Sequence, residues 1–127
     1  MAIKKIEHVG VMVKDIEASI RFYQEVLGMK LLYRMPNENL QLAFLGFQDS
    51  NETELELIQG YNDQLPAEGK VHHLAFTVDN IEKEIERLKQ HDIQWIDEEV
   101  TILPNGSKYI FFYGPDGEWI ELFESTR

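Results

Sequence analysis

Apolar and polar residues follow the same order of patterns in the two halves of the chain. Each half opens with alternating apolar residues that predict a strand, at 6–13 and at 71–78. A helical stripe of apolar residues follows, over 16–27 and over 81–88. Three more strand-like runs complete each half: 30–34, 40–47 and 54–59, then 93–97, 107–113 and 118–124. The pattern predicts an α+β fold with the order β-α-β-β-β, twice.

Local signals mark the ends of these elements. Asp15 is placed to cap the first helix, and Gly28 is placed to end it. Asp79 with Glu82 resembles a capping box at the start of the second helix. Pro115-Asp116-Gly117 is typical of a turn before the last strand.

The two halves also repeat each other residue by residue. Residues 8–20 align with 73–85 at an offset of 65, which sets His8 on His73. The same offset, continued without a gap, sets Phe44, Leu45 and Phe47 on Tyr109, Ile110 and Phe112, and Leu55-Glu56-Leu57 on Ile120-Glu121-Leu122. The spacing from His to Glu is therefore 48 in each half, since 56 − 8 and 121 − 73 are equal.

We interpret the repeat as one domain, 1–127, made of two βαβββ modules at about 1–62 and 70–127. Pro66 and Gly69 mark the loop between them. A four-stranded module with its helix on one face leaves the other face open. The two modules are therefore expected to close around a shared space, within one chain or between two.

Strand alternation decides which side chains reach the open faces. In the first strand the valines at 9, 11 and 13 suit the helix-covered side, so His8 points the other way, beside Gly10. By the same parity His73 faces away from the bulkier side of its strand, whereas His72 is interpreted as a packing or surface residue. The open faces thus receive a histidine and a glutamate from each module: His8, Glu56, His73 and Glu121.

Two imidazoles and two carboxylates in one cavity call for a divalent metal, because unpaired buried carboxylates are costly. Nitrogen and oxygen donors without sulfur suit Ni, Co, Mn, Fe(II) or Zn and leave positions for water or substrate. A single histidine is more often structural, and Glu56 between leucines is typical of a solvated strand face. Only the joint recurrence at equal spacing favours a metal site.

The composition of the chain limits the classes of binding partner that we expect. The chain has 23 acidic and 12 basic residues, a formal net charge of −11, and no cysteine. Such an acidic protein repels nucleic acid and anionic membranes, so neither is expected as a partner. The lack of cysteine excludes disulfides and thiolate metal sites. The first residues do not resemble a signal peptide, and no apolar run nears the roughly 18 residues of a membrane span, so a cytoplasmic location is expected.

Several motifs resemble the vicinal oxygen chelate superfamily and, within it, most closely glyoxalase I. They are His8-Val9-Gly10, Val13-Lys14-Asp15-Ile16, Arg21-Phe22-Tyr23, Leu27-Gly28-Met29-Lys30-Leu31 and Gly114-Pro115-Asp116-Gly117-Glu118-Trp119-Ile120-Glu121-Leu122. The resemblance covers essentially the whole chain and implies the paired-module fold of that superfamily. Carried over by position, it implies a divalent metal (Ni, Co or Zn) held by His8, Glu56, His73 and Glu121. Glutamate at 56 favours glyoxalase over extradiol dioxygenases and epimerases.

The resemblance also implies a reaction. The hemithioacetal of a 2-oxoaldehyde such as methylglyoxal would be isomerised to a 2-hydroxyacyl thioester, with Glu121 or Glu56 as general base. The substrate would be a small molecule, and the active form a homodimer. Four residues are expected to form the apolar wall that binds it: Met12, Ile58, Trp119 and Phe123. A non-catalytic small-molecule binding or resistance module is the alternative, as is another superfamily enzyme such as an epimerase or an extradiol dioxygenase.

The chain departs from glutathione-using members at two positions. Those members carry an Arg four residues after the first ligand and an Asn four residues after the second, and here these are Met12 and Gly60. Arg34 or Lys108 could substitute as the cation, and Asn62 lies close to Gly60 in the sequence. The thiol partner therefore stays open between glutathione and another thiol.

Overall fold

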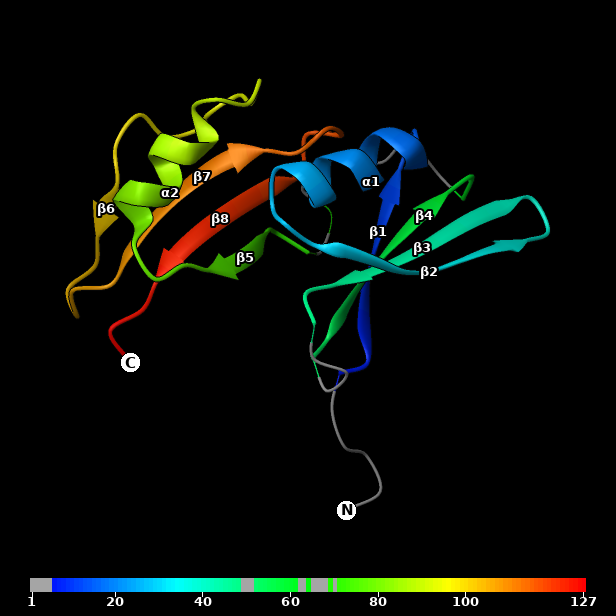
Figure 1. Ribbon diagram of the computed structural model, residues 1–127, viewed down its shortest axis with the longest axis horizontal. Helices are drawn as coiled ribbons and strands as arrows, with labels where there is room; N and C mark the ends of the chain where they lie inside the picture. Colours follow the sequence, from blue (N-terminus) through cyan, green and yellow to red (C-terminus); the bar gives the residue numbers. More distant parts are fainter. Residues whose placement is uncertain (1–5, 49–51, 62–63, 65–68, 70) are drawn as a thin grey trace, which may run out of the picture. The chain divides into compact units, whose positions relative to one another are not determined.

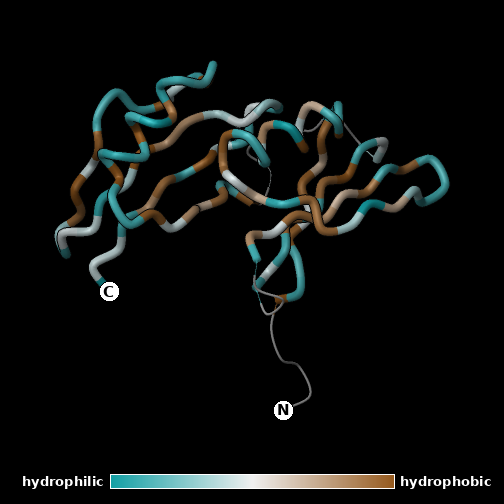
Figure 2. The backbone as a smooth tube through the Cα atoms, in the orientation of Figure 1, coloured by the Kyte–Doolittle hydropathy of each residue, from teal (hydrophilic) through white to brown (hydrophobic). Residues whose placement is uncertain are grey.

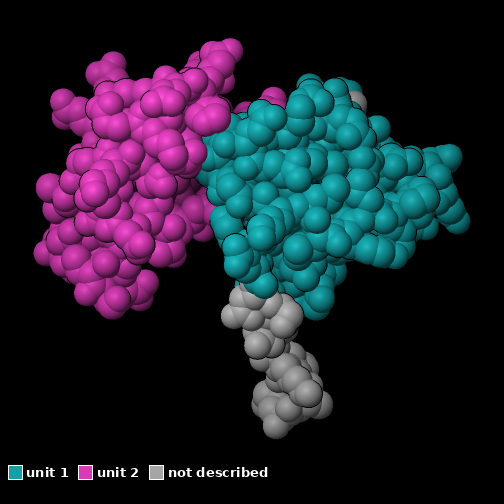
Figure 3. Space-filling model, viewed as in Figure 1, with its two compact units in different colours: residues 1–65 teal, residues 66–127 magenta. Residues whose placement is uncertain are grey.

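The chain folds into two units of the same construction, Met1–Leu65 and Pro66–Arg127 (Figure 3). They are seen in a computed structural model that describes residues 6–48, 52–61, 64, 69 and 71–127. Each unit holds one helix and one four-stranded sheet (Figure 1). This is the predicted arrangement of two βαβββ modules.

Unit 1 contains β1 (His8–Val13), α1 (Ile16–Glu25), β2 (Lys30–Asn37), β3 (Leu40–Gly46) and β4 (Glu54–Gln59). Its strands form sheet A in the order β1-β4-β3-β2. The first and last strands of the module, β1 and β4, pair in parallel, with Gly10 opposite Glu56. The other pairs are antiparallel. The parallel pairing brings the histidine strand directly beside the glutamate strand.

Unit 2 contains β5 (Leu74–Thr77), α2 (Ile81–Leu88), β6 (Thr101–Ile102), β7 (Lys108–Tyr113) and β8 (Trp119–Glu124). Its strands form sheet B in the corresponding order, β5-β8-β7-β6. Here β5 and β8 are the parallel pair, with Ala75 opposite Glu121. The strand β5 is shorter at both ends than the strand expected over 71–78.

Each helix begins at a side chain that accepts backbone hydrogen bonds. Asp15 accepts from the N–H groups of Glu17 and Ala18, as predicted. The α1 turn ends at Gly28, whose φ of 73° is a left-handed conformation that favours glycine. The expected capping box at Asp79 is wrong by one residue: Asn80 is the cap of α2, because its side chain accepts from the N–H of Lys83.

The core of each unit lies between its helix and one face of its sheet. Figure 2 shows the alternation of apolar and polar positions along the strands. In unit 1 the apolar side chains of α1 lie over Leu55 and Leu57 of β4, and in unit 2 those of α2 lie over Ile120 and Leu122 of β8; all four are buried. The opposite face of each sheet is therefore not covered by the helix of its own unit.

The strand predicted over 93–97 is not a regular strand. Trp95 makes one isolated bridge to Phe112, and the second strand of the module is the two-residue β6 instead. The carboxylate of Asp97 accepts the N–H of Phe111, so a side chain takes a hydrogen bond that a continuous ladder would have used. The segment runs beside β7 without joining its sheet.

The gap-free offset of 65 is also wrong in the third strand of each module. Phe44 lies opposite Glu56, but the residue opposite Glu121 is Phe111, which is 67 positions after Phe44. The turn between β7 and β8 is two residues shorter than the connection between β3 and β4. Because a shift of two residues preserves the alternation of a strand, the predicted faces survive it.

Candidate metal centre

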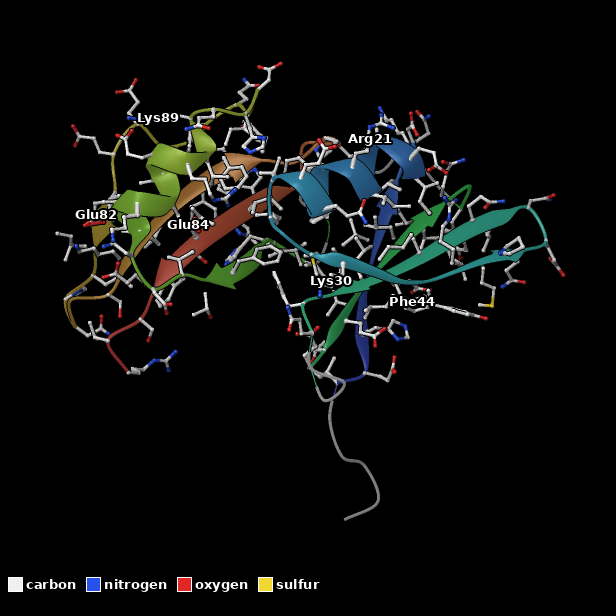
Figure 4. The ribbon with its side chains drawn as sticks, viewed as in Figure 1. Arg21, Lys30, Phe44, Glu82, Glu84 and Lys89 are labelled. Carbon is white, nitrogen blue, oxygen red and sulfur yellow. The ribbon has the colours of Figure 1, made fainter. Side chains whose placement is uncertain are left out.

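His8 of unit 1 lies on the face of sheet A that α1 does not cover. Val13 of the same strand is buried on the helix side, as the parity predicts. The His8 ring packs edge-on against Phe44, with 5.5 Å between ring centroids. Figure 4 labels Phe44 on β3, below the sheet, with α1 above it. The Nδ1 of His8 lies 2.7 Å from a carboxylate oxygen of Glu7.

Glu56 joins His8 from the neighbouring strand. The Nε2 of His8 and the Oε1 of Glu56 are 3.4 Å apart, and the side chains are 40% and 13% exposed. Gly10 lies two residues after His8 and opposite Glu56 on the neighbouring strand, and a Cβ at this position would lie 3.3 Å from the Oε1 of Glu56. The glycine therefore leaves room for the carboxylate.

Unit 2 repeats this arrangement. The Nε2 of His73 and the Oε1 of Glu121 are 3.0 Å apart, and the side chains are 35% and 10% exposed. The His73 ring packs edge-on against Phe111 at 5.2 Å between centroids. Its Nδ1 lies 2.9 Å from the Nδ1 of His72. In both units Nδ1 is thus held by the preceding residue, and Nε2 is directed to the glutamate.

The donor set and its spacing suit a divalent metal. Two ligand atoms held about 2.1 Å from one ion, at an angle of about 90–110°, lie about 3.0–3.4 Å apart. The two Nε2–Oε1 distances, 3.4 Å and 3.0 Å, match this separation. A hydrogen bond on the Nδ1 side that leaves Nε2 for the ion is also typical of metal-binding histidines.

The structure brings the four predicted ligands together in pairs: His8 with Glu56 in unit 1, and His73 with Glu121 in unit 2. Within residues 6–48, 52–61, 64, 69 and 71–127 it shows no group of three or more His, Asp or Glu side chains that could hold a metal ion. A centre of all four residues therefore remains a prediction.

The two pairs differ in electrostatics. Hydrogen bonding to Glu7 raises the pKa of His8, and the negative charge of Glu56 adds to this. Burial raises the pKa of Glu121, while His73 opposes the rise. The histidine of unit 1 therefore has acidic neighbours, whereas the carboxylate of unit 2 is shielded from water by burial.

The predicted apolar wall lies on the same faces as the pairs. Met12 is opposite Ile58 on sheet A, in line with Gly10 opposite Glu56. Trp119 and Phe123 lie on either side of Glu121 along β8, on its face of the sheet. Their part in substrate binding stays a prediction.

Three nearby residues escaped the sequence analysis. Phe44 and Phe111 pack against the two histidines, but the two-residue shift in the repeat hid their equivalence. His72 is exposed and packs against neighbouring rings, as expected of a packing or surface residue, and the rings it contacts are those of His73 and Trp119, at 5.1 Å between centroids in each case. Strand parity did not indicate these two contacts, because β5 begins only at Leu74.

The two candidate cations lie on the helix-covered sides. Arg34 forms an ion pair of 2.6 Å with Glu17 of α1, and Lys108 one of 2.9 Å with Glu82 of α2. Glu17 and Glu82 are themselves repeat positions. These pairings place neither cation beside the His–Glu pair of its unit. Asn62 lies outside the described residues.

Gly60 has a structural reason to be glycine. Its φ is 102°, and a Cβ there would lie 2.7 Å from the backbone oxygen of Asn39. An asparagine at this position would be strained and would require the chain to move. The departure at Gly60 is thus built into the backbone of unit 1.

Comparisons with known proteins identify the family and agree with the fold. The family model described as the Glyoxalase/Bleomycin resistance protein/Dioxygenase superfamily matches residues 5–122. The chain is 57% identical over 123 residues to the uncharacterised Bacillus subtilis (strain 168) protein YwbC, covering 95% of this chain and 98% of that one. It is 34% identical over 126 residues to a lactoylglutathione lyase of Salmonella typhimurium, covering 95% and 93%. The solved trypanothione-dependent glyoxalase I of Leishmania major gives a TM-score of 0.80 at 29% identity, covering 95% and 86%.

Proposed function

The chain belongs to the glyoxalase/bleomycin resistance/dioxygenase superfamily, and on that premise we propose that it is a metal-dependent, glyoxalase I-like enzyme. Its substrate would be the hemithioacetal formed by a thiol and a 2-oxoaldehyde such as methylglyoxal, and its product a 2-hydroxyacyl thioester. The identity to lactoylglutathione lyase supports the activity class. Met12 and Gly60 leave the thiol open.

One observation carries the proposal. At matching positions in both units a histidine Nε2 and a glutamate Oε1 lie 3.4 Å and 3.0 Å apart, on the face of each sheet that the helix of its own unit does not cover. His8, Glu56, His73 and Glu121 would hold the metal, either Ni, Co or Zn. When bound, a divalent ion would supply Lewis-acid stabilisation of the negative charge that develops on the substrate oxygens.

The remaining chemistry falls to the carboxylates. Glu121 or Glu56 would remove the proton from the carbon that carries sulfur, and the electron pair released would form the carbon–carbon double bond. As that double bond forms, the carbonyl electron pair of the neighbouring carbon would move onto its oxygen. The same carboxylic acid would then return the proton to the neighbouring carbon. The hydroxyl proton of the sulfur-bearing carbon would pass to the neighbouring oxygen, which leaves the thioester carbonyl and the 2-hydroxyl group of the product. No oxidant or reductant is required. Glu121 suits the role because its burial favours the proton-carrying form between the two transfers.

The apolar wall would exclude water and orient the substrate. Met12 and Ile58 flank the pair in unit 1, and Trp119 and Phe123 flank the pair in unit 2. An apolar lining around a few polar groups is typical of small-molecule sites. The solvent exclusion it provides would also protect the intermediate from side reactions.

We also propose, from the resemblance, that the active form is a homodimer. Variants His8→Ala and His73→Ala, each in its own chain, would be mixed, unfolded together and refolded. If each centre takes one pair from each chain, half of the sites in a mixed dimer are intact and activity returns. If each centre lies within one chain, the mixture stays inactive.

The direct test combines metal content with turnover. We expect purified protein to contain a divalent metal by elemental analysis, and chelated protein to be inactive. Adding Ni(II) or Co(II) should restore thioester formation from methylglyoxal and a thiol. Protein that binds no metal yet holds a small molecule would instead favour a binding or resistance module, and oxygen uptake with catechols would favour a dioxygenase. Either result would overturn the proposal.

A further inference from the structure

The face of sheet B away from α2 carries a continuous group of aromatic rings. We call it the aromatic face; its members alternate along β7 and β8 and are Tyr109, Phe111, Tyr113, Trp119 and Phe123. All five are half-buried, whereas Phe112 and Ile120 on the other side of the sheet are fully buried beneath α2. The rings therefore are not the core of this unit.

The rings support one another edge to edge. Phe111 lies 5.6 Å from Tyr109 and 5.4 Å from Trp119, between centroids. Tyr113 lies 6.4 Å from Trp119. The planes are inclined by 62–84°, so ring faces remain available for stacking by a ligand.

The polar pair of unit 2 lies within this face. Phe111 is the partner of Glu121 on one side, and Ala75 is its partner on the other. Ala75 and Thr77 are small and exposed, so space remains beside the carboxylate. A few polar groups among aromatic side chains are what a site for a small organic ligand requires.

The strands of sheet B offer no cation to an anionic occupant of this face. The four strands of sheet B contain a single Lys or Arg, Lys108, and its ammonium is paired with Glu82 of α2 on the helix side. Figure 4 labels Glu82 on that helix. A carboxylate of a peptide thiol placed on the aromatic face would meet Glu121 and no counter-charge from the strands of the sheet.

From these observations we infer that the aromatic face binds an uncharged aromatic group, so that the preferred hemithioacetal combines an aromatic 2-oxoaldehyde with an uncharged thiol. The inference names the substrate class of the proposed function and rests on it. The aromatic ring would pack against Phe111, Trp119 and Tyr109, beside the His73–Glu121 pair.

The first experiment compares three substrates with the metal-loaded protein. They are the hemithioacetals of phenylglyoxal with 2-mercaptoethanol, methylglyoxal with 2-mercaptoethanol, and methylglyoxal with glutathione. We expect kcat/KM to fall in that order, with at least about a tenfold advantage for the aromatic substrate, as one added aromatic contact allows. Equal values, or a preference for glutathione, would overturn the inference while leaving the glyoxalase activity intact.

The second experiment assigns the preference to the face. Tyr109→Leu should lower the phenylglyoxal-to-methylglyoxal ratio of kcat/KM about fivefold, mainly through KM. The matched control is Tyr61→Leu, which removes an equally large ring that is 73% exposed and lies outside both sheets. A ratio unchanged in Tyr109→Leu, or lowered equally in both variants, would contradict the assignment.

A binding measurement separates this inference from the enzymatic proposal. Calorimetry with 2-hydroxyacetophenone, hydroxyacetone and mandelate compares a neutral aromatic, a neutral aliphatic and an anionic aromatic compound. We expect the neutral aromatic compound to bind tightest, and Tyr109→Leu to weaken it. If the neutral aromatic compound binds tightest in protein that shows no turnover, the proposed function is wrong while the inference about the aromatic face is supported. If mandelate binds as well, the charge assignment is overturned.

Discussion

In unit 1 the His8–Glu56 pair has acidic neighbours, whereas in unit 2 the His73–Glu121 pair lies among aromatic rings. Glu7 touches the Nδ1 of His8, and Glu54 stands opposite His8 on the adjacent strand. At the corresponding repeat positions unit 2 has His72 and Trp119. One scaffold therefore presents the same pair of donors in two different environments.

The difference indicates a division of labour between the copies. Negative charge around His8 raises its pKa and favours a cation nearby. Aromatic rings around Glu121 exclude water, which raises the pKa of this carboxylate and suits it to proton transfer. We expect unit 1 to contribute mainly to metal affinity and unit 2 mainly to substrate binding and chemistry.

The largest expected effect distinguishes the two glutamates. Glu121→Gln should lower kcat about 10³-fold, because a general base is lost while its hydrogen-bonding shape is kept. Steady-state kinetics at saturating metal would measure this. The control is Glu54→Gln, an acidic strand residue that faces the same way as Glu56; it should stay within about twofold. A fully active Glu121→Gln variant would contradict the role assigned to unit 2.

The next effect compares the two cores. Leu57 and Leu122 occupy the same repeat position, and both are buried. Leu57→Ala and Leu122→Ala should each lower the free energy of unfolding by about 2–5 kcal/mol. Both tryptophans, Trp95 and Trp119, belong to unit 2, so their fluorescence reports on the unfolding of that unit.

Denaturant titrations followed by tryptophan fluorescence and by circular dichroism would resolve the two contributions. We expect Leu122→Ala to shift the unfolding transition seen by fluorescence, and Leu57→Ala to shift mainly the transition seen by circular dichroism. The units would have to be treated as one cooperative body if both variants moved the two signals equally.

A smaller effect concerns the residues that hold Nδ1. Glu7→Leu should weaken metal binding about tenfold, in the range seen when a histidine loses its outer hydrogen-bond partner. His72→Leu should weaken it less, since an imidazole is a poorer acceptor than a carboxylate. Calorimetric titration with Ni(II) measures both, and Glu7→Gln, which keeps an acceptor oxygen, should fall between wild type and Glu7→Leu. An equal loss of metal affinity in Glu7→Leu and His72→Leu would contradict the expected difference between the two units.

The smallest effect is expected from the two strand cations. Arg34→Met and Lys108→Met should change kcat/KM for a glutathione hemithioacetal less than about twofold, because both cations pair with helix glutamates. Lys108 also lowers the pKa of Glu82. The pair therefore stabilises the fold above the unfolded-state pKa of Glu82 and loses this contribution as pH falls through the lowered value. A large rise in KM would show instead that these cations bind substrate.

Much of the fold follows from the sequence because alternation and helical spacing are local signals. The strand and helix order follows from alternation and helical spacing, the Asp15 cap from the residue type at the helix start, and the face of each donor from strand parity. The irregular 93–97 segment was not, because its alternation is typical of a strand while the Asp97 carboxylate takes over a ladder hydrogen bond. That interaction connects residues 14 positions apart and leaves no trace in the local pattern.

The candidate site was predictable only in part for a related reason. His8, Glu56, His73 and Glu121 recur at one spacing, which the sequence displays. The ring contacts of Phe44 and Phe111 depend on strand register, and a two-residue change in a turn concealed it. The pairing of Arg34 and Lys108 with helix glutamates depends on the side of the sheet that each cation occupies and on the helix residue that it meets.

The central claim is that both units supply ligands to one metal ion. Titrating metal-free protein with Co(II), and following its visible absorption, measures how many ions bind per chain. The account predicts one ion per chain in the wild type and loss of that band in His8→Ala and in His73→Ala alike. Two ions per chain, or one ion retained in either variant, would show that each pair acts alone and would contradict it.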